Sequence, residues 1–289
     1  MRFAATLFAS LALLLASARA HAELLYATSG TDVARFDSGS TGVVTSVPVT
    51  GLQTGESLIG IDVRPANQLL YGVGSSSRLY TINPLTGAAT PVGAAGAFTL
   101  SGTAFGIDFN PVADRLRVVG NTGQNLRLSP DTGALAATDT AITPAGTTAT
   151  GLAYSANGAG ATSTTLYVID ATSGQLSTLG GPGGSPSPNG GVVSPVGSMG
   201  LGTNLDPRLG FDITGVPDTA YATILTGGTD KLYRLNLTTG AATLVGTIGT
   251  GTTVYSGLAA AAAVPEPVSG LLLALGAAAA MLPRRRRAR

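Results

Sequence analysis

Short stretches in which apolar and polar residues alternate recur along the chain from residue 24 to residue 260. They are rich in Leu, Val, Ile and Tyr, as half-buried β-strands are. Five of them open on a glycine, followed by an apolar residue and then Asp or Ala, at Gly60, Gly106, Gly151, Gly210 and Gly257. These glycines are 46, 45, 59 and 47 residues apart, and such a period indicates one structural unit used several times.

A second strand-like element follows in each unit, and in three units it leads into a glycine turn. The elements are residues 35–37, 78–83, 125–128, 165–170 and 231–236. In the turns a polar residue precedes a glycine by four positions: Asn83 and Gly87, Asp170 and Gly174, Asn236 and Gly240. Asn or Asp closes such a turn with its side chain, and glycine supplies the positive φ. With another short strand after the turn, each unit has about four strands in about 46 residues, which is typical of a propeller blade.

The two ends of the repeated region complete one another. Residues 257–259 form a lone first strand, whereas residues 24–50 resemble a blade without its first strand. A ring closed in this way leaves no open sheet edge. We therefore predict an all-β fold, a β-propeller of five four-stranded blades closed by the N- and C-terminal strands. The extra residues between Gly151 and Gly210 predict a loop around residues 180–191, and a six-bladed ring or a β-solenoid stays open as an alternative.

Residues 1–22 have the order of a secretory signal peptide. A basic start at Arg2 precedes the apolar residues 3–16, and small residues flank His21. The apolar run is shorter than the roughly 20 residues of a membrane-spanning helix. We expect export by the Sec machinery and cleavage by signal peptidase before Glu23, which makes residues 23–263 the folded domain.

Residues 264–289 predict a transient membrane insertion. The apolar residues 268–282 follow a Pro-Glu-Pro box and precede an arginine cluster, which would stay in the cytoplasm. Fifteen residues at about 1.5 Å each span roughly 22 Å of a bilayer core about 30 Å thick. The residues of this signal are Pro265, Glu266, Pro267, Arg284, Arg285, Arg286 and Arg287.

This order of box, apolar segment and arginine tail resembles the PEP-CTERM sorting signals of Gram-negative bacteria. The resemblance implies that an exosortase-type enzyme recognises Pro265, Glu266 and Pro267. It would place the exported protein at the cell surface, in the outer envelope or in the extracellular matrix. A plain tail anchor with a proline-rich hinge is the alternative.

Residues 52–133 carry a second resemblance, through the stretches 55–65, 106–111, 114–119 and 124–127. They are similar to the bacterial secreted family called domain of unknown function 4394. That resemblance implies a propeller-like secreted domain and lends no established activity.

Charge and residue types exclude several functions. Between residues 23 and 264 there are nine Lys and Arg against fourteen Asp and Glu, a net charge of about −5, so a nucleic-acid partner is not expected. The chain has no cysteine, and its one histidine, His21, leaves with the signal peptide. Hydrolases with a Ser-His-Asp or Cys-His site and zinc sites with nitrogen or sulfur ligands are therefore disfavoured.

Two sets of charged residues are candidate sites. Asp62, Asp108 and Asp212 occupy the same place in three units. They would either converge on the central channel and hold a hard cation such as calcium, or accept hydrogen bonds from neighbouring turns. The second set would form an anion or sugar site, or buried structural ion pairs: Glu56, Arg64, Asp114, Arg115, Arg117 and Arg127.

Two functions from different classes follow. The first is a non-enzymatic binding or structural module of the surface or matrix, with exopolysaccharide as its ligand. The second is a cation-dependent propeller enzyme acting on a lactone, ester or sugar, with Asp62, Asp108 and Asp212 as metal ligands. Apart from calcium, no cofactor is evident.

Overall fold

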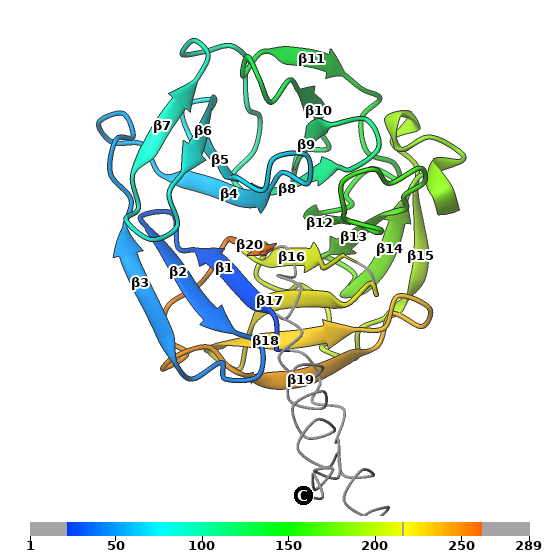
Figure 1. Ribbon diagram of the computed structural model, residues 1–289. Helices are drawn as coiled ribbons and strands as arrows, with labels where there is room; N and C mark the ends of the chain where they lie inside the picture. Colours follow the sequence, from blue (N-terminus) through cyan, green and yellow to red (C-terminus); the bar gives the residue numbers. More distant parts are fainter. Residues whose placement is uncertain (1–21, 216, 262–289) are drawn as a thin grey trace, which may run out of the picture.

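The computed structural model describes residues 22–215 and 217–261. These residues form twenty β-strands and two short 3-10 helices. The strands make five separate four-stranded antiparallel sheets, which stand around a central axis as the blades of a propeller (Figure 1). Among the described residues no helix is long and apolar enough to cross a membrane. The predicted signal peptide and sorting signal lie outside the described residues, except for Ala22.

The blades are numbered along the chain from the first complete one. From the innermost strand outward, blade 1 contains β4 (Leu58–Val63), β5 (Leu70–Gly74), β6 (Arg78–Ile82) and β7 (Ala89–Val92). Blade 2 contains β8 (Phe105–Asn110), β9 (Arg115–Gly120), β10 (Asn125–Leu128) and β11 (Leu135–Thr138). Blade 3 contains β12 (Ala149–Tyr154), β13 (Leu166–Asp170), β14 (Gln175–Leu179) and β15 (Val193–Ser198). Blade 4 contains β16 (Gly210–Ile213), β17 (Ala220–Thr226), β18 (Thr229–Leu235) and β19 (Ala242–Thr247).

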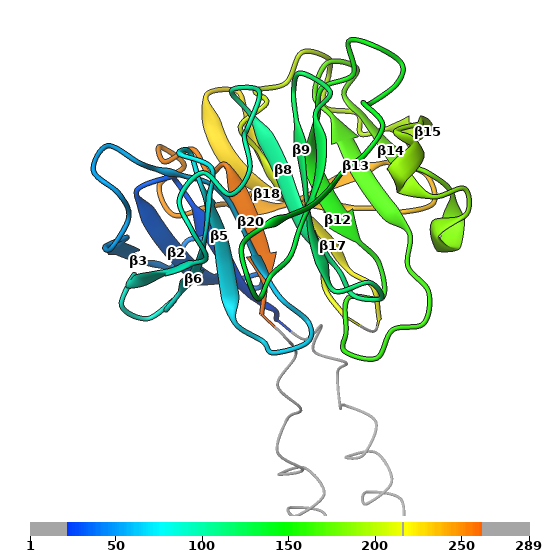
Figure 2. The same ribbon diagram turned by 90° about the horizontal axis from the view of Figure 1, so that it is seen from above.

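Blade 5 joins the two ends of the described chain. It contains β20 (Gly257–Ala260), β1 (Leu24–Thr28), β2 (Asp32–Asp37) and β3 (Val44–Pro48). β20 pairs with β1 so that Leu25 lies opposite Ala260, and β1 begins on the face where β20 ends (Figure 2). The innermost strands contact one another in the order β4, β8, β12, β16, β20 and back to β4. The five-bladed ring and its closure are thus confirmed, and the six-bladed and solenoid alternatives are wrong.

One predicted equivalence between the units is wrong. The recurring second element is the third strand in blades 1, 2, 4 and 5, but residues 165–170 form the second strand of blade 3. The turn from Asp170 to Gly174 therefore joins β13 to β14, whereas the turn from Asn83 to Gly87 joins β6 to β7. Alternation with a period of two is the same in both positions, so it cannot distinguish them.

The extra residues of blade 3 form the predicted loop, between β14 and β15. The loop includes the two 3-10 helices, η1 (Pro182–Gly184) and η2 (Pro188–Gly190). It crosses to blade 2, where the Thr140 amide donates to the carbonyl of Asn189 at 3.1 Å. This blade 3 loop therefore bridges two blades on one side of the ring.

The apolar core is divided into five clusters, each of which lies between neighbouring blades. Between blades 1 and 2, for example, Tyr71 packs edge-on against Phe109 with ring centroids 5.1 Å apart. Aromatic pairs of this kind stabilise an interface beyond the area they bury. No single interior holds the fold, because each blade covers the apolar face of the next.

The repeated glycines lie where the innermost strands approach most closely. A Cβ on Gly210 would lie 2.5 Å from the amide nitrogen of Leu258 in blade 5. On Gly106 it would lie 2.5 Å from a side-chain carbon of Leu152, and on Gly60 3.0 Å from one of Ile107. The two distances of 2.5 Å are too short for a carbon atom, and 3.0 Å is tighter than most Cβ contacts. The repeat therefore uses glycine to let the blades meet at the axis.

We expect Gly210→Ala to destabilise the protein by about 2 kcal/mol or more, because the added methyl group must separate blades 4 and 5. The measurement is the free energy of unfolding in urea. Gly42→Ala is the matched control, since a Cβ there meets nothing within 4 Å. If both substitutions lower the free energy of unfolding equally, the glycine at position 210 is not required for close packing of the blades at the axis.

Candidate functional site

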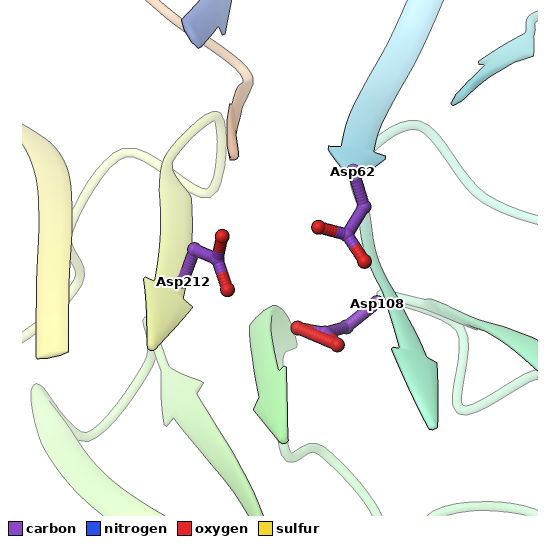
Figure 3. Close-up of side chains that lie close together, drawn as sticks. All are labelled: Asp62, Asp108 and Asp212. Atoms are coloured by element: carbon purple, nitrogen blue, oxygen red, sulfur yellow. The ribbon is translucent and has the colours of Figure 1, made fainter. Parts of the chain in front are cut away.

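The residue two positions after the repeated glycine faces the axis of the ring. In blades 1, 2 and 4 this residue is Asp62, Asp108 or Asp212, and each side chain is almost fully buried, with 1% of the residue exposed. One carboxylate oxygen from each lies within 4.8 Å of the other two. Figure 3 shows the three carboxylates directed toward a common space. The predicted convergence on the central channel is therefore observed, and we call these residues the axial aspartates.

The axial aspartates also accept hydrogen bonds from the backbone of the inner strands, as the alternative interpretation expected. Five amides are bound in this way, one from each blade. The bonds are Val63 N (2.7 Å) and Phe109 N (2.7 Å) to Asp62, Tyr154 N (3.3 Å) to Asp108, and Ile213 N (2.6 Å) and Ala260 N (2.5 Å) to Asp212. Three side chains thus satisfy five buried donors, which would otherwise destabilise the fold.

The distribution of these bonds follows from the order of the blades. Oδ2 of each aspartate accepts a hydrogen bond from an amide of the next blade. In blades 3 and 5 the residue two positions after the repeated glycine, here called the axial position, is Ala153 or Ala259. An aspartate whose preceding blade carries one of these alanines also accepts, with Oδ1, a hydrogen bond from the amide of the residue that follows it. Asp108 follows a blade with an aspartate, so the amide of Phe109 is already bound to Asp62. Oδ1 of Asp108 is consequently buried without a hydrogen-bond partner.

Burial raises the pKa of all three axial aspartates. The neighbouring charge of Asp212 adds to the rise for Asp62, and the charges of Asp62 and Asp212 add to it for Asp108. For Asp212, burial outweighs the hydrogen bonds from Ala260 and Ile213 and raises the pKa to about 7. Three negative charges in so small a buried space require protons or a cation.

The space around the axial aspartates is small. On one side the axis is narrowed by apolar residues of the inner strands to a cavity of about 10 Å³, lined by Ile61, Ile107 and Phe211 among others. On the other side a cavity of about 20 Å³ is lined by Val63, Asn157 and Ala260, which is room for one water molecule. Neither cavity admits an organic substrate.

The predicted set of arginines and acids separates into three places. Arg64 donates to both oxygens of Asp114, at 2.8 and 2.5 Å, and to Asp131 at 2.6 Å. The hydrogen bond from Arg64 lowers the pKa of Asp114. Arg64 and Asp114 are therefore a structural ion pair between blades 1 and 2, as one of the two interpretations expected.

Glu56 does not join the arginines. Its carboxylate accepts hydrogen bonds from the Ser76 hydroxyl at 2.5 Å, from the Gln53 amide at 3.1 Å and from the Tyr80 hydroxyl. Burial acts to raise the pKa of Glu56, but these hydrogen bonds outweigh it and the pKa is lowered. Glu56 thus fixes a turn of blade 1, and its assignment to an anion or sugar site has no support in the geometry.

Arg117 and Arg127 share one carboxylate, that of Asp139. Arg127 binds both of its oxygens at 2.8 Å, and Arg117 binds one at 3.0 Å. Arg117 is fully buried and also donates to Tyr154 Oη at 2.8 Å and to Asn189 Oδ1 at 2.6 Å. Asn189 belongs to the blade 3 loop, so this loop is held against blade 2 by the guanidinium of Arg117.

Arg117, Arg127, Tyr154 and Asn189 line a pocket of about 230 Å³ between blades 2 and 3. Its walls include Arg115, Arg117 and Arg127 and, from the blade 3 loop, Ser187 and Asn189. We call it the arginine pocket. Asp139 pairs with Arg117 and Arg127, and in the part of the chain that the structure describes Arg115 forms no ion pair, although its charge contributes to lowering the pKa of the adjacent Asp114. Three arginines and no acidic residue thus line the pocket.

Sequence reasoning missed several residues of these sites. Asp131 and Asp139 pair with arginines of the predicted set, and Tyr154 and Asn189 fix Arg117 from blade 3. Asp131 and Asp139 lie outside the repeated motifs, and Asn189 lies in a segment without periodicity. The scarcity of charged residues, 11% of the chain, is the one signal that could have drawn attention to the two acids.

Comparison with known proteins finds a family match and distant structural likenesses. The model of a family described as domain of unknown function (DUF4394) matches residues 32–259. No curated protein matches the chain. The chain is 15% identical to PorZ, a surface component of the type-IX secretion system of Porphyromonas gingivalis, with a TM-score of 0.39 over 76% of this chain and 27% of PorZ. It is 17% identical to a candidate 6-phosphogluconolactonase from Bacteroides uniformis, with a TM-score of 0.40 over 81% of this chain and 72% of that one.

The chain is also 13% identical to the Dos1 propeller, with a TM-score of 0.41 over 76% of this chain and 57% of that one. The chain spans only about a quarter of PorZ and less than two thirds of the Dos1 propeller. At these scores the likenesses bear on neither ligand nor activity, which have to be inferred from the sites themselves.

The Arg64–Asp114 pair predicts a pH dependence of stability. Asp114→Asn removes the charge, while Asn tolerates the positive φ of 49° at this position. Since the pKa of Asp114 is lowered below 3.8, the pair stabilises the fold above that pH and its contribution is lost as pH falls through the lowered value. We expect Asp114→Asn to reduce the free energy of unfolding by about 1 kcal/mol at neutral pH and by progressively less as the pH falls below 3.8. Urea unfolding at a series of acidic pH values is the measurement, and a difference that does not shrink as the pH falls would contradict it.

Proposed function

Because the chain belongs to the family described as domain of unknown function (DUF4394), whose name assigns no activity, we propose a function from its own residues. The protein is a non-enzymatic binding module that holds an acidic saccharide in the arginine pocket. The observation that carries this proposal is that three arginines and no acidic residue line the pocket, with Asp139 paired to two of these arginines.

The free donors of the pocket suit a carboxylate. Arg127 uses Nε and Nη2 on Asp139, which leaves Nη1 for a ligand. Arg115 donates from Nη1 to the adjacent carbonyl of Asp114 and has its other N–H groups free of ion pairs within the described residues. Planar guanidinium groups bind carboxylates with two parallel hydrogen bonds, so a uronate is the sugar they would recognise.

The rest of the lining suits the hydroxyl groups of a sugar. Thr162, Ser163 and Thr164 from blade 3 and Ser187 from its loop line the pocket. The single aromatic lining residue, Tyr154, is buried and bonded to Arg117, so stacking on a sugar ring is not offered. Recognition therefore depends on charge and hydrogen bonds, which favours an acidic saccharide over a neutral one.

The alternative, a cation-dependent enzyme acting on a lactone, ester or sugar, is less well supported. A catalytic metal keeps an open position for its substrate. The axial aspartates lie between cavities of about 10 and about 20 Å³, too small for such substrates. A calcium ion at the axis would thus serve the structure of the ring and not catalysis.

Export and sorting belong to the same proposal. Support comes from the sequence: residues 1–22 have the order of a signal peptide, and residues 264–289 resemble a PEP-CTERM sorting signal. The partners we propose are the Sec machinery, signal peptidase, an exosortase-type enzyme and an acidic exopolysaccharide. The module would then work at the cell surface, in the outer envelope or in the extracellular matrix.

Binding is tested by calorimetry of the purified protein with oligogalacturonate, and with maltooligosaccharides of the same length as the neutral comparison. We expect binding of oligogalacturonate alone, weakened at high salt because the contacts are ionic. Arg115→Ala should lower the affinity at least about tenfold, the loss of one charged hydrogen-bonded contact. Arg234→Ala, an exposed arginine of β18, should leave it unchanged. Equal binding of the neutral oligomer, or no effect of Arg115→Ala, would overturn the proposal.

Sorting is tested by replacing Pro265, Glu266 and Pro267 with alanine in the source bacterium. If an exosortase-type enzyme recognises these residues, the altered protein should keep its C-terminal segment and remain in the membrane fraction. Mass spectrometry and cell fractionation measure both. Unchanged mass and unchanged location would show that the Pro-Glu-Pro box is not a sorting signal.

A further inference from the structure

We propose that the axial aspartates bind one divalent cation, calcium in preference to magnesium, which links blades 1, 2 and 4 across the centre of the ring. The site is distinct from the arginine pocket, and the inference does not depend on the proposed function.

The spacing of the carboxylates fits a calcium ion. Oxygens no more than 4.8 Å apart have between them a point that lies within about 2.8 Å of all three. Calcium takes oxygen ligands at about 2.3–2.6 Å in flexible geometry, whereas magnesium requires about 2.0–2.1 Å and near-octahedral order. Calcium therefore needs only a small contraction of the cluster, and magnesium a larger one.

A buried oxygen without a partner points to the same ion. Oδ1 of Asp108 has no hydrogen-bond donor, because the five axial amides are already used by the other carboxylate oxygens. A buried acceptor without a hydrogen-bond partner destabilises the fold, and a cation at the centre would remove this destabilisation. Oδ1 of Asp108 is unpaired because the preceding blade carries Asp62, which already accepts the hydrogen bond of the Phe109 amide. The sequence of axial residues thus accounts for the unpaired oxygen.

Further oxygen ligands are close by. Oδ1 of Asn157 is also buried without a partner, and this side chain lies within hydrogen-bonding reach of Asp212. The cavity of about 20 Å³ beside it has room for one water molecule. Calcium binds six to eight oxygens, and carboxylates, an amide oxygen and water are the kinds of ligand it takes.

The hydrogen bonds with the backbone prepare the cluster for an ion. Amides of the inner strands hold Asp62 and Asp212 by both carboxylate oxygens, so their orientation is fixed before binding. The raised pKa values of the axial aspartates agree with a place where negative charge needs compensation. Blade 4 lies across the ring from blades 1 and 2 (Figure 1), so the ion would connect blade 4 to two blades with which it shares no apolar cluster.

The test measures metal content and thermal unfolding of the purified protein near pH 8. We expect about one calcium per chain by elemental analysis after dialysis against calcium. We also expect a melting temperature about 5 °C or more higher in millimolar calcium than in chelator, and a smaller rise in magnesium. Asp108→Asn should abolish both the bound calcium and the rise.

Asp230→Asn is the matched control. Asp230 is equally buried, its Oδ2 accepts a bond from the Tyr255 amide at 2.7 Å, and its Oδ1 has no partner, but it lies outside the cluster. This variant should keep the calcium response. Absence of bound calcium in the unaltered protein, with equal melting temperatures in calcium and chelator, would overturn the proposal and assign the charge compensation to protons. That measurement decides the matter even where Asp108→Asn does not fold, and Asp212→Asn then repeats the comparison.

Discussion

The architecture depends on how closely five inner strands approach one another at the axis of the ring. A side chain at the repeated glycine would collide with the next blade, as the distance of 2.5 Å from a Gly210 Cβ to Leu258 N makes plain. Close approach also buries five backbone amides that point toward the axis. Three aspartates bind all five. The same constraint that requires glycine thus brings together the acidic cluster.

Much of the fold follows from the spacing of that glycine. The motif of glycine, apolar residue and Asp or Ala recurs five times along the chain. The number of blades and the closing strand could therefore be predicted from the sequence alone. The place of Asp62, Asp108 and Asp212 at the axis could be predicted for the same reason. What spacing could not show is that Asp108 keeps one oxygen unpaired, since this depends on which blades carry Ala in the axial position.

The arginine pocket was much less accessible to prediction. Arg115, Arg117 and Arg127 come from blade 2, but the groups that fix them come from elsewhere: Asp139 follows the last strand of that blade, and Asn189 belongs to the blade 3 loop. Ion pairs between distant segments have no period in the sequence. The loop without periodicity, rich in Gly, Pro and Ser, supplies part of the pocket wall through Gly183, Gly184, Ser187, Pro188 and Asn189.

Closure by β1 and β20 has a consequence for how the chain reaches its native state. Leu25 and Ala260 are neighbours in one sheet, although almost the whole domain separates them in sequence. A chain that emerges from the ribosome with its N-terminus first holds β1 with one edge unpaired until β20 is made. Contacts this distant in sequence form slowly, and unpaired edges are where chains associate wrongly. The ring can therefore close only when β20 pairs with β1, at the end of folding. A factor that covers the unpaired edge of β1 during synthesis or transport would raise the yield of native protein.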